Sequence, residues 1–239
     1  MTAVDQGASP QSAAFFDVDG TLAKTTIVHY YIYFRRRRMS RAVGAVWLAF
    51  YWLKCIYYLV LDKISRSRLN IVFYRGYRRL NTKDIHSMAR DCHDEIVRPR
   101  FFAQGGRCVE SHRRAGRQVV LVTGSVDFTI QPLAEELGVN GMLARSLVES
   151  NGVFTGELDG PPIGEEEKVR QMRRYAEENG IDLSQSYAYG DSVADLPMLE
   201  AVGMPHAVNP DRALKAVARA RGWPMHEWTV DGSGEDATL

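Results

Sequence analysis

The chain has 239 residues, 45% of them apolar, and its 30 lysines and arginines nearly balance 29 aspartates and glutamates, leaving a net charge of +1. This length and composition suffice for one α/β domain with a small accessory domain, and the near-neutral charge argues against a nucleic-acid partner. Three cysteines, Cys55, Cys92 and Cys108, show no close pairing pattern, which favours a reducing compartment and predicts a cytoplasmic protein.

The chain begins with a polar segment of small residues. It lacks the basic start and apolar centre of a signal peptide, so we expect a disordered tail over residues 1–12. We expect a second flexible tail at 230–239.

Two aspartates end the first predicted strand. In residues 15–21, FFDVDGT, an apolar run stops at Asp17 and Asp19. Side chains at positions i and i+2 share a face of a strand, and Gly20 allows the chain to bend sharply beyond them. Two carboxylates this close must share a metal ion or a proton, or take different chemical roles. The pair therefore marks a candidate active site.

A segment of about ninety residues, 23–113, follows and is predicted to be almost entirely helical. Within it, residues 42–61 are apolar over about a membrane's width except for Lys54, and four arginines at 35–38 precede them. A single span would place Asp17 and the later Thr123 on opposite sides of a bilayer, although we expect both in one site. Two interpretations stay open. We favour a buried helix that lines the substrate cavity, and the alternative is peripheral membrane contact through 35–61.

A second apolar strand, over residues 118–123, ends in Thr123, Gly124 and Ser125. A hydroxyl and exposed backbone N–H groups at a strand-to-helix turn can bind the oxygens of a phosphate. The alternative is an ordinary helix N-cap at Ser125 or Asp127.

Lys168 lies near the start of a helix predicted over 164–179, directly after three glutamates. A compact ammonium group pairs well with a phosphoryl group or a catalytic carboxylate. The alternative is a solvated helix residue held by the neighbouring glutamates.

Two more aspartates follow a third strand end. Asp191 comes directly after Gly190, and Asp195 lies four residues further on. Mg²⁺ in enzymes is usually held by one or two carboxylates together with substrate oxygens and water, so one further acid beside Asp17 and Asp19 fits a catalytic magnesium site. The alternative is a pair of capping aspartates.

The strands and helices alternate, which predicts a parallel sheet covered on both faces with its ligand site at the carboxyl ends of the strands. Segments 141–148 and 153–158 could instead form a hairpin. The predicted strands are 13–17, 118–123, 141–148 and 186–190, and the predicted helices are 127–137, 164–179, 193–201 and 211–221.

The four motifs together resemble the haloacid dehalogenase superfamily of phosphatases, and more narrowly its subfamily IB, which contains phosphoserine phosphatase. The resemblance covers residues 13–22 and about 113–228. It implies a Rossmann-like α/β core formed by 13–22 and 114–229, with a helical cap domain inserted at 23–113 that closes over the substrate.

The resemblance also implies roles for individual residues. Asp17 would be the nucleophile that forms an aspartyl-phosphate, and Asp19 the general acid and then the general base. Thr123 and the Gly124 N–H would hold phosphoryl oxygens.

By the same resemblance, Mg²⁺ would be bound by Asp17, the backbone carbonyl of Asp19 and Asp191. Lys168 would stabilise charge on the phosphoryl group and pair with Asp195 or Asp17. The chain would then be a Mg²⁺-dependent phosphatase acting on a small-molecule phosphomonoester.

The substrate is less defined. Phosphoserine phosphatases carry a glutamate nine residues after the nucleophile, where this chain has Thr26, so phosphoserine itself is an alternative only. A further alternative is a membrane-associated phosphatase or docking module that meets lipid-like phosphates through the apolar cap helix. The cap's polar and aromatic residues could face the cavity or form the cap core: His29, Tyr30, Tyr31, Tyr33 and Phe34.

Overall fold

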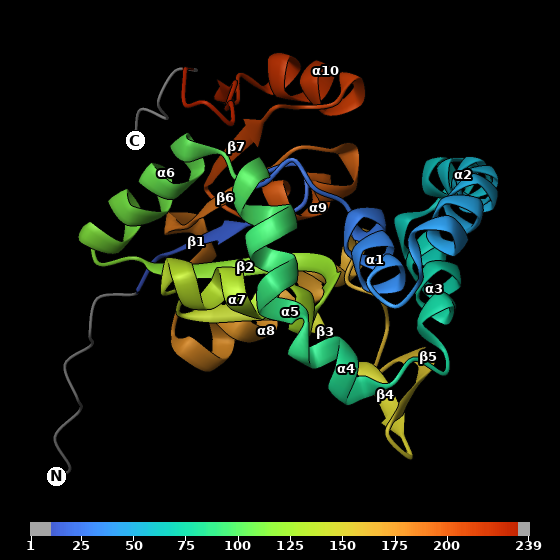
Figure 1. Ribbon diagram of the computed structural model, residues 1–239. Helices are drawn as coiled ribbons and strands as arrows, with labels where there is room; N and C mark the ends of the chain where they lie inside the picture. The colour runs from blue at the N-terminus through green and yellow to red at the C-terminus, as the bar shows by residue number, and fades with distance from the viewer. Residues whose placement is uncertain (1–10, 234–239) are drawn as a thin grey trace, which may run out of the picture.

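The computed structural model describes residues 11–233, apart from the side chains at 60, 62–64 and 66. A six-stranded sheet forms the centre, in the order β3-β2-β1-β6-β7-β8, and every pair of neighbouring strands is parallel (Figure 1). The predicted parallel α/β fold is confirmed. The strands are β1 (Ala13–Phe16), β2 (Gln118–Val126), β3 (Gly141–Arg145), β6 (Tyr187–Gly190), β7 (Met204–Val208) and β8 (Met225–His226).

Strand β1 lies between β2 and β6 and fixes their register. Phe16 aligns with Leu121 on β2 and with Tyr189 on β6. All four residues of β1 are fully buried, which explains the unbroken apolar run in the sequence. The carboxyl ends of the three strands therefore meet at one edge of the sheet.

Helices cover both faces of the sheet, as the alternating pattern predicted. Two of them share a core cluster with Phe16, Leu121 and Tyr189, and three share the opposite cluster with Phe15 and Val120. The first two are α6 (Ala103–Arg114) and α7 (Asp127–Leu137), and the other three are α8 (Glu165–Asn179), α9 (Leu196–Glu200) and α10 (Arg212–Arg221).

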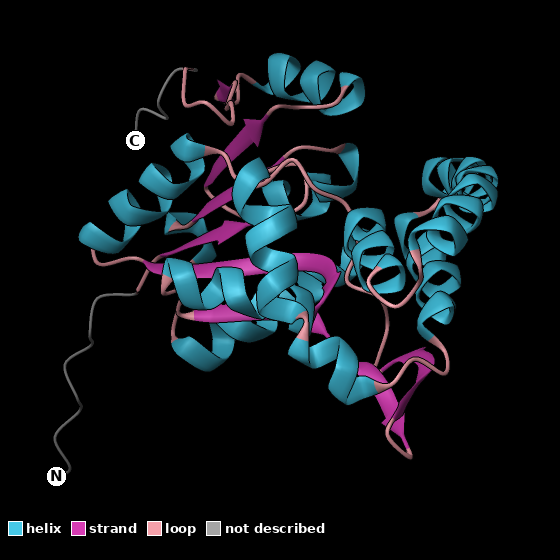
Figure 2. Cartoon of the chain, viewed as in Figure 1, coloured by secondary structure: helices cyan, strands magenta, loops and turns pink. Residues whose placement is uncertain are grey.

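Between β1 and α6 the chain forms a group of helices beside the sheet (Figure 2). Aromatic side chains hold the first three together, because the ring of Tyr31 on α1 lies 5.4 Å from that of Tyr51 on α2 and 5.5 Å from that of Phe73 on α3. These helices are α1 (Ile27–Arg36), α2 (Arg41–Ile64), α3 (Arg66–Tyr74), α4 (Thr82–Ser87) and α5 (Ala89–Cys92).

The domain boundaries stay predictions. Helix α6 bears on the boundary at residue 113, because it lies inside the predicted cap but packs on the sheet. It contacts β1 and β2, and its His112 ring packs against Phe16 and Tyr189. The last helix of the predicted insertion thus covers the sheet.

The segment predicted as a strand at 141–148 divides in two. Its first part is β3, which stays in the parallel sheet, whereas β4 (Leu147–Ser150) pairs antiparallel with β5 (Val153–Leu158). The hairpin alternative is therefore right for the second half only. This hairpin packs against α3 and the short helix that follows it.

The interpretation of 42–61 as a buried helix lining the cavity is wrong. Helix α2 buries one narrow face, through Tyr51, Cys55 and Tyr58, and leaves most of its large apolar side chains exposed. It is 24 residues long, and its segment Arg41–Leu59 is long and apolar enough to cross a membrane by length and composition. Its packing on α1 and α3 holds it against the rest of the protein instead.

Most of both predicted tails lies outside the described residues, namely 1–10 and 234–239. At the end of the first, Gln11 forms a parallel bridge with Ile181. Residue 11 is therefore paired with the main body of the protein.

Candidate active site

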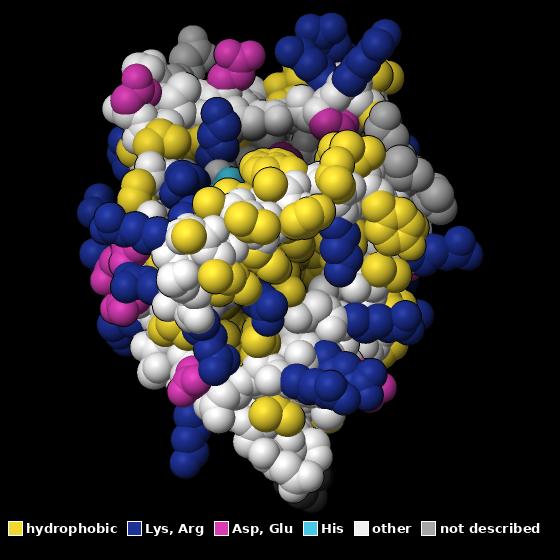
Figure 3. Space-filling model, turned by 45° about the vertical axis from the view of Figure 1, so that its right-hand side comes forward, with side chains coloured by type: hydrophobic (Ala, Val, Ile, Leu, Met, Phe, Trp, Pro, Cys, Tyr) yellow, Lys and Arg dark blue, Asp and Glu magenta, His cyan; other side chains and the backbone are white. Residues whose placement is uncertain are grey.

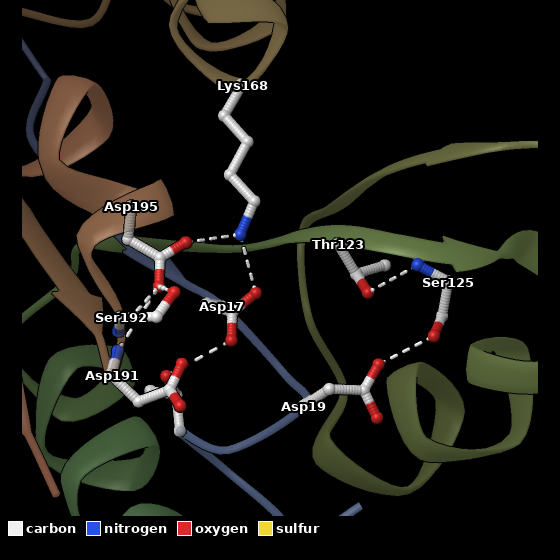
Figure 4. Close-up of polar contacts among 9 residues, drawn as sticks. Asp17, Asp19, Thr123, Ser125, Lys168, Asp191, Ser192 and Asp195 are labelled. Atoms are coloured by element: carbon white, nitrogen blue, oxygen red, sulfur yellow. Dashed lines mark hydrogen bonds and ion pairs between the residues drawn. The ribbon is translucent and has the colours of Figure 1, made fainter. Parts of the chain in front are cut away.

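Asp17 lies at the centre of a buried charge cluster at the carboxyl edge of the sheet (Figure 4). Lys168 Nζ lies 2.6 Å from Asp17 Oδ1 and 2.6 Å from Asp195 Oδ1, and the Thr21 hydroxyl donates to Asp17 Oδ2 at 3.1 Å. Each of these side chains is almost fully buried. Strand β1, helix α8 and the loop after β6 thus bring together Asp17, Lys168 and Asp195, which lie far apart in the sequence.

Burial and charge act against each other in this cluster. Burial raises the pKa of Asp17 to about 7, although Lys168 lowers it, and the nearby Asp195 raises it further. For Lys168, burial lowers the pKa, but Asp17 and Asp195 outweigh it and the net shift is upward. Lys168 therefore carries its charge, and Asp17 is a carboxylate that any additional cation would hold ionised.

Asp191 and Asp195 follow β6 and have different surroundings. Asp195 Oδ2 accepts hydrogen bonds from the backbone N–H groups of Asp191 and Ser192 and from the Ser192 hydroxyl, each at 3.2 Å. Asp195 is therefore both part of a helix cap and the second partner of Lys168.

The carboxylate of Asp191 lies against Gly20. A Cβ atom at Gly20 would lie 2.2 Å from Asp191 Oδ2, and Gly20 has φ of +100°. Only glycine fits this turn, because it has no side chain and tolerates positive φ. The turn after β1 thus brings Asp191 close to Asp17.

The carboxylates of Asp17, Asp191 and Asp195 suit a hard divalent cation. One oxygen from each lies within 4.8 Å of the others, and oxygen ligands of this kind are those that Mg²⁺ prefers. Asp195 already accepts from Lys168 and from two backbone N–H groups, so Asp17 and Asp191 are the side chains better placed to hold the ion. Both belong to the metal-ligand set predicted from sequence.

Asp19 lies apart from this cluster and points towards Ser125 (Figure 4). Its Oδ1 accepts hydrogen bonds from Thr25 and Tyr30, both at 2.8 Å, and its Oδ2 accepts one from Ser125 at 2.6 Å. Three hydroxyl groups thus fix the orientation of the Asp19 carboxylate.

Strand β2 contributes Gly124 and Ser125 to the cavity wall. The Thr123 hydroxyl accepts from the Ser125 N–H at 3.0 Å, is buried, and is not among the residues that line the cavity. Its predicted contact with phosphate therefore stays a prediction. Tyr74 on α3 donates to the Gly124 carbonyl at 2.9 Å and so links the cap helices to this loop.

A cavity of about 200 Å³ opens over these groups, lined by Asp17, Asp19, Lys168 and Asp191 among others. Asn70 on α3 also lines it, is 1% exposed, and has no hydrogen-bond partner for either amide atom among the described residues. A buried amide without partners is costly, typically by about 1–3 kcal/mol. Asn70 is therefore a candidate for a group that bonds the substrate.

The aromatic residues of α1 do not line this cavity. Tyr31, Tyr33 and Phe34 are buried in the cap core, and Tyr30 reaches the site only by its hydroxyl on Asp19. His29 lines a separate groove, whereas Thr26 lines the catalytic cavity.

Ser125 was predicted as part of an anion cradle or as a helix cap, and Tyr30 as a residue of the cavity or of the cap core. Sequence reasoning missed Thr25 and Asn70, which nothing distinguished from neighbouring cap residues. Their hydroxyl and amide groups reach the site through helix packing. No short sequence pattern could have identified them.

Comparison with known proteins supports this geometry. A family model of haloacid dehalogenase-like hydrolases matches residues 14–200. The chain is 36% identical to a Streptomyces azureus protein named for inhibition of morphological differentiation, over 94% of this chain and 81% of that protein. It is 33% identical to a probable phosphatase of Mycobacterium tuberculosis, over 92% of this chain and 77% of that protein.

The fold is also that of a substrate-bound phosphoserine phosphatase. The two superpose with a TM-score of 0.66 over 87% of this chain and 91% of the other, at 18% sequence identity. The match of the family model over most of the chain, together with the ordered strand-end motifs, gives the assignment. The chain belongs to the haloacid dehalogenase-like hydrolase family, and within it stands among the phosphatases.

Proposed function

We propose that this protein is a Mg²⁺-dependent phosphatase that hydrolyses a small-molecule phosphomonoester through an aspartyl-phosphate on Asp17. The observation that carries the proposal is the separation of two nearby carboxylates. Asp17 accepts a hydrogen bond from Lys168 beside Asp191, whereas Asp19 accepts hydrogen bonds from three hydroxyl groups. Two acids in such different surroundings can take different chemical roles.

In the first step, a carboxylate oxygen of Asp17 attacks phosphorus and the ester P–O bond breaks. Asp19 gives a proton to the leaving alkoxide. Lys168, held by Asp17 and Asp195, stabilises the negative charge on the phosphoryl oxygens.

In the second step, water attacks the phosphorus of the aspartyl-phosphate. Asp19, now deprotonated by the first step, takes a proton from that water, and the P–O bond to Asp17 breaks to release inorganic phosphate. Bound Mg²⁺, held by Asp17 and Asp191 with the Asp19 carbonyl as predicted, would supply positive charge that lets two anions approach. Asp19 returns to its protonated form.

The substrate proposal rests on the cavity. Its volume of about 200 Å³ suits a small phosphomonoester, and the hydroxyl of Thr26 stands where phosphoserine phosphatases carry a glutamate. The amide of Asn70 offers an NH2 donor group and a carbonyl acceptor to the leaving group. A substrate with a hydroxyl or carbonyl close to the phosphate therefore fits better than one that needs a carboxylate partner for its ammonium group.

Phosphate release from a broad panel of phosphomonoesters tests the proposal. We expect turnover with Mg²⁺, none with excess EDTA, and recovery when Mg²⁺ is restored. Turnover that persists in EDTA would contradict the metal requirement. Failure of every phosphomonoester, from a protein shown by circular dichroism to be folded, would contradict the activity.

A further inference from the structure

Helix α2 presents a wide apolar face to solvent. Eight large apolar side chains on it are between 51% and 70% exposed. Figure 3 shows apolar side chains gathered in a continuous ridge with lysines and arginines around its margins. Exposed apolar patches of this extent mark interaction surfaces. The residues, here named the α2 face, are Val43, Val46, Phe50, Trp52, Leu53, Ile56, Tyr57 and Leu59.

The apolar side chains of the α2 face are each more than half exposed. Phe50, Leu53 and Tyr57 recur every three or four residues and so lie along one side of the helix. Tyr51, Cys55 and Tyr58 lie on the other side and are buried against the cap. The helix is thus divided lengthwise into a buried side and an exposed apolar side, as in helices that lie in a membrane interface.

The region around this helix is strongly basic. Residues 24–83 contain 14 of the chain's 30 lysines and arginines but one of its 29 aspartates and glutamates. Their formal charge is therefore +13, against −12 for the rest of the chain. The near-neutral total hides this division of charge.

Part of the positive charge lines a groove at the amino end of α2. The groove has a volume of about 430 Å³, and Glu95 is its single acidic residue among those described. Arg37 pairs with Glu95, while Arg36, Arg41 and Arg100 also line the groove. Guanidinium groups bind phosphate through paired donors, so the groove fits an anionic headgroup.

We propose that the α2 face docks on the surface of a membrane that contains anionic lipids, with its apolar side chains among the acyl chains and the arginines on the headgroups. A second copy of the chain is a poorer occupant. A two-fold dimer through this face would bring two regions of charge +13 together, whereas an anionic bilayer complements both the charge and the apolar face. The proposal does not depend on the phosphatase chemistry.

Vesicle flotation tests it with the full chain. We expect the protein to float with vesicles of phosphatidylcholine mixed with phosphatidylglycerol, and less with phosphatidylcholine alone or at high salt. Phe50→Ser combined with Leu53→Ser should weaken binding about tenfold or more. Val148→Ser combined with Met225→Ser removes exposed apolar residues away from α2 and should leave binding unchanged.

Tryptophan quenching by brominated lipids places the contact on the helix. Trp52 is 59% exposed on the α2 face, so its fluorescence should fall on vesicles containing brominated chains, and Trp52→Phe should remove most of that quenching. Circular dichroism of every variant would show that each is folded.

Several outcomes would overturn the proposal. They are absence of flotation with anionic vesicles, equal loss of binding in the control pair, and quenching that survives Trp52→Phe. Analytical ultracentrifugation tests for the other occupant. If the protein does not float but forms a dimer, and Phe50→Ser with Leu53→Ser dissociates that dimer, the face binds a second copy of the chain.

Discussion

Asp17 and Asp19 are two residues apart yet have different partners. Asp17 contacts the ammonium group of Lys168 in a buried cluster, whereas Asp19 accepts hydrogen bonds from three hydroxyl groups. The strand ends at Phe16, so the chain turns between them and their side chains diverge. This turn lets one short segment supply both a nucleophile and a proton-transfer group.

Substitution of Asp19 separates the two steps. Asp19→Asn should lower turnover of an alkyl phosphate about 10²–10⁴-fold, since proton transfer is lost in both steps. With p-nitrophenyl phosphate, whose leaving group needs no proton, the first step should survive and the aspartyl-phosphate should accumulate. Rapid-quench kinetics would measure a burst of p-nitrophenol. Absence of that burst would contradict a proton-transfer role for Asp19.

Asn70 should act in substrate binding. Its amide atoms are buried in the cavity wall without partners among the described residues, so Asn70→Leu should leave the free energy of unfolding unchanged or raise it by about 1 kcal/mol. The same variant should raise KM about tenfold. Chemical denaturation and steady-state kinetics together test this, because a purely structural asparagine would lower stability and leave KM unchanged.

The residues that sequence could identify lie at strand ends or near helix starts. Asp17, Lys168, Asp191 and Asp195 stand beside apolar runs or helix starts, and the structure brings them together. Asn70 could not be identified, because its position depends on how α3 packs over the sheet.

At the level of elements, the turn after β1 is the most constrained. Gly20→Ala places a Cβ 2.2 Å from Asp191 Oδ2 at positive φ, so we expect the concentration of Mg²⁺ needed for half-maximal activity to rise at least about tenfold, with a loss of about 1–3 kcal/mol in stability. Magnesium titration of activity and thermal unfolding measure the two effects.

Gly152→Ala is the matched control for that substitution. Gly152 also has positive φ, at +76°, but an added Cβ there meets nothing within 4 Å. It should lower stability by a similar amount without changing the Mg²⁺ requirement. An equal Mg²⁺ effect in both variants would show that backbone strain, and not displacement of Asp191, is responsible.

Long periodic elements were predictable, and short or exposed ones were not. Helices α7 and α8 begin and end within a residue of the predicted bounds. Strands β7 and β8 were missed, since β8 has two residues and β7 contains Pro205. The prediction that helix α2 is buried was wrong, because an apolar sequence does not show which side of a helix packs against the rest of the protein.

Across the whole molecule, cap and core are joined at the site. Tyr74 of α3 donates to the Gly124 carbonyl, and Ser67 of α3 donates to Glu165 at the start of α8, at 2.7 Å. These contacts place Asn70 over the catalytic cluster. Movement of α3 would therefore change access to the cavity and the position of Asn70 together.

Buried histidines should make the protein less stable in acid. Burial, with help from Arg117, lowers the pKa of His112 to about 3, and burial, with help from His226, lowers that of His206 to about 4. In the unfolded chain each histidine has its ordinary pKa of 6.5, so below about pH 6.5 the unfolded chain binds more protons than the folded chain. The contribution of each histidine to the free energy of unfolding is therefore fully present above pH 6.5 and decreases as the pH drops.

The slope identifies the contribution of His112. Below pH 6.5 the free energy of unfolding that neutral His112 contributes should fall by about 1.4 kcal/mol per pH unit. His112→Gln should flatten the pH dependence of the unfolding free energy by about that amount. Denaturant unfolding from pH 7 to pH 4.5 in both proteins measures it. Parallel curves would contradict a neutral buried His112.

The most direct test of the proposed chemistry is to trap the covalent intermediate. The enzyme is mixed with its best substrate and Mg²⁺, quenched in acid within milliseconds, reduced with borohydride and mapped by mass spectrometry. We predict a modified aspartate in the peptide that contains Asp17, assigned to Asp17 by fragmentation and absent from Asp17→Asn, which should release phosphate about 10³-fold more slowly or worse. Modification of Asp19 or Asp191 instead, or undiminished phosphate release by Asp17→Asn, would contradict it.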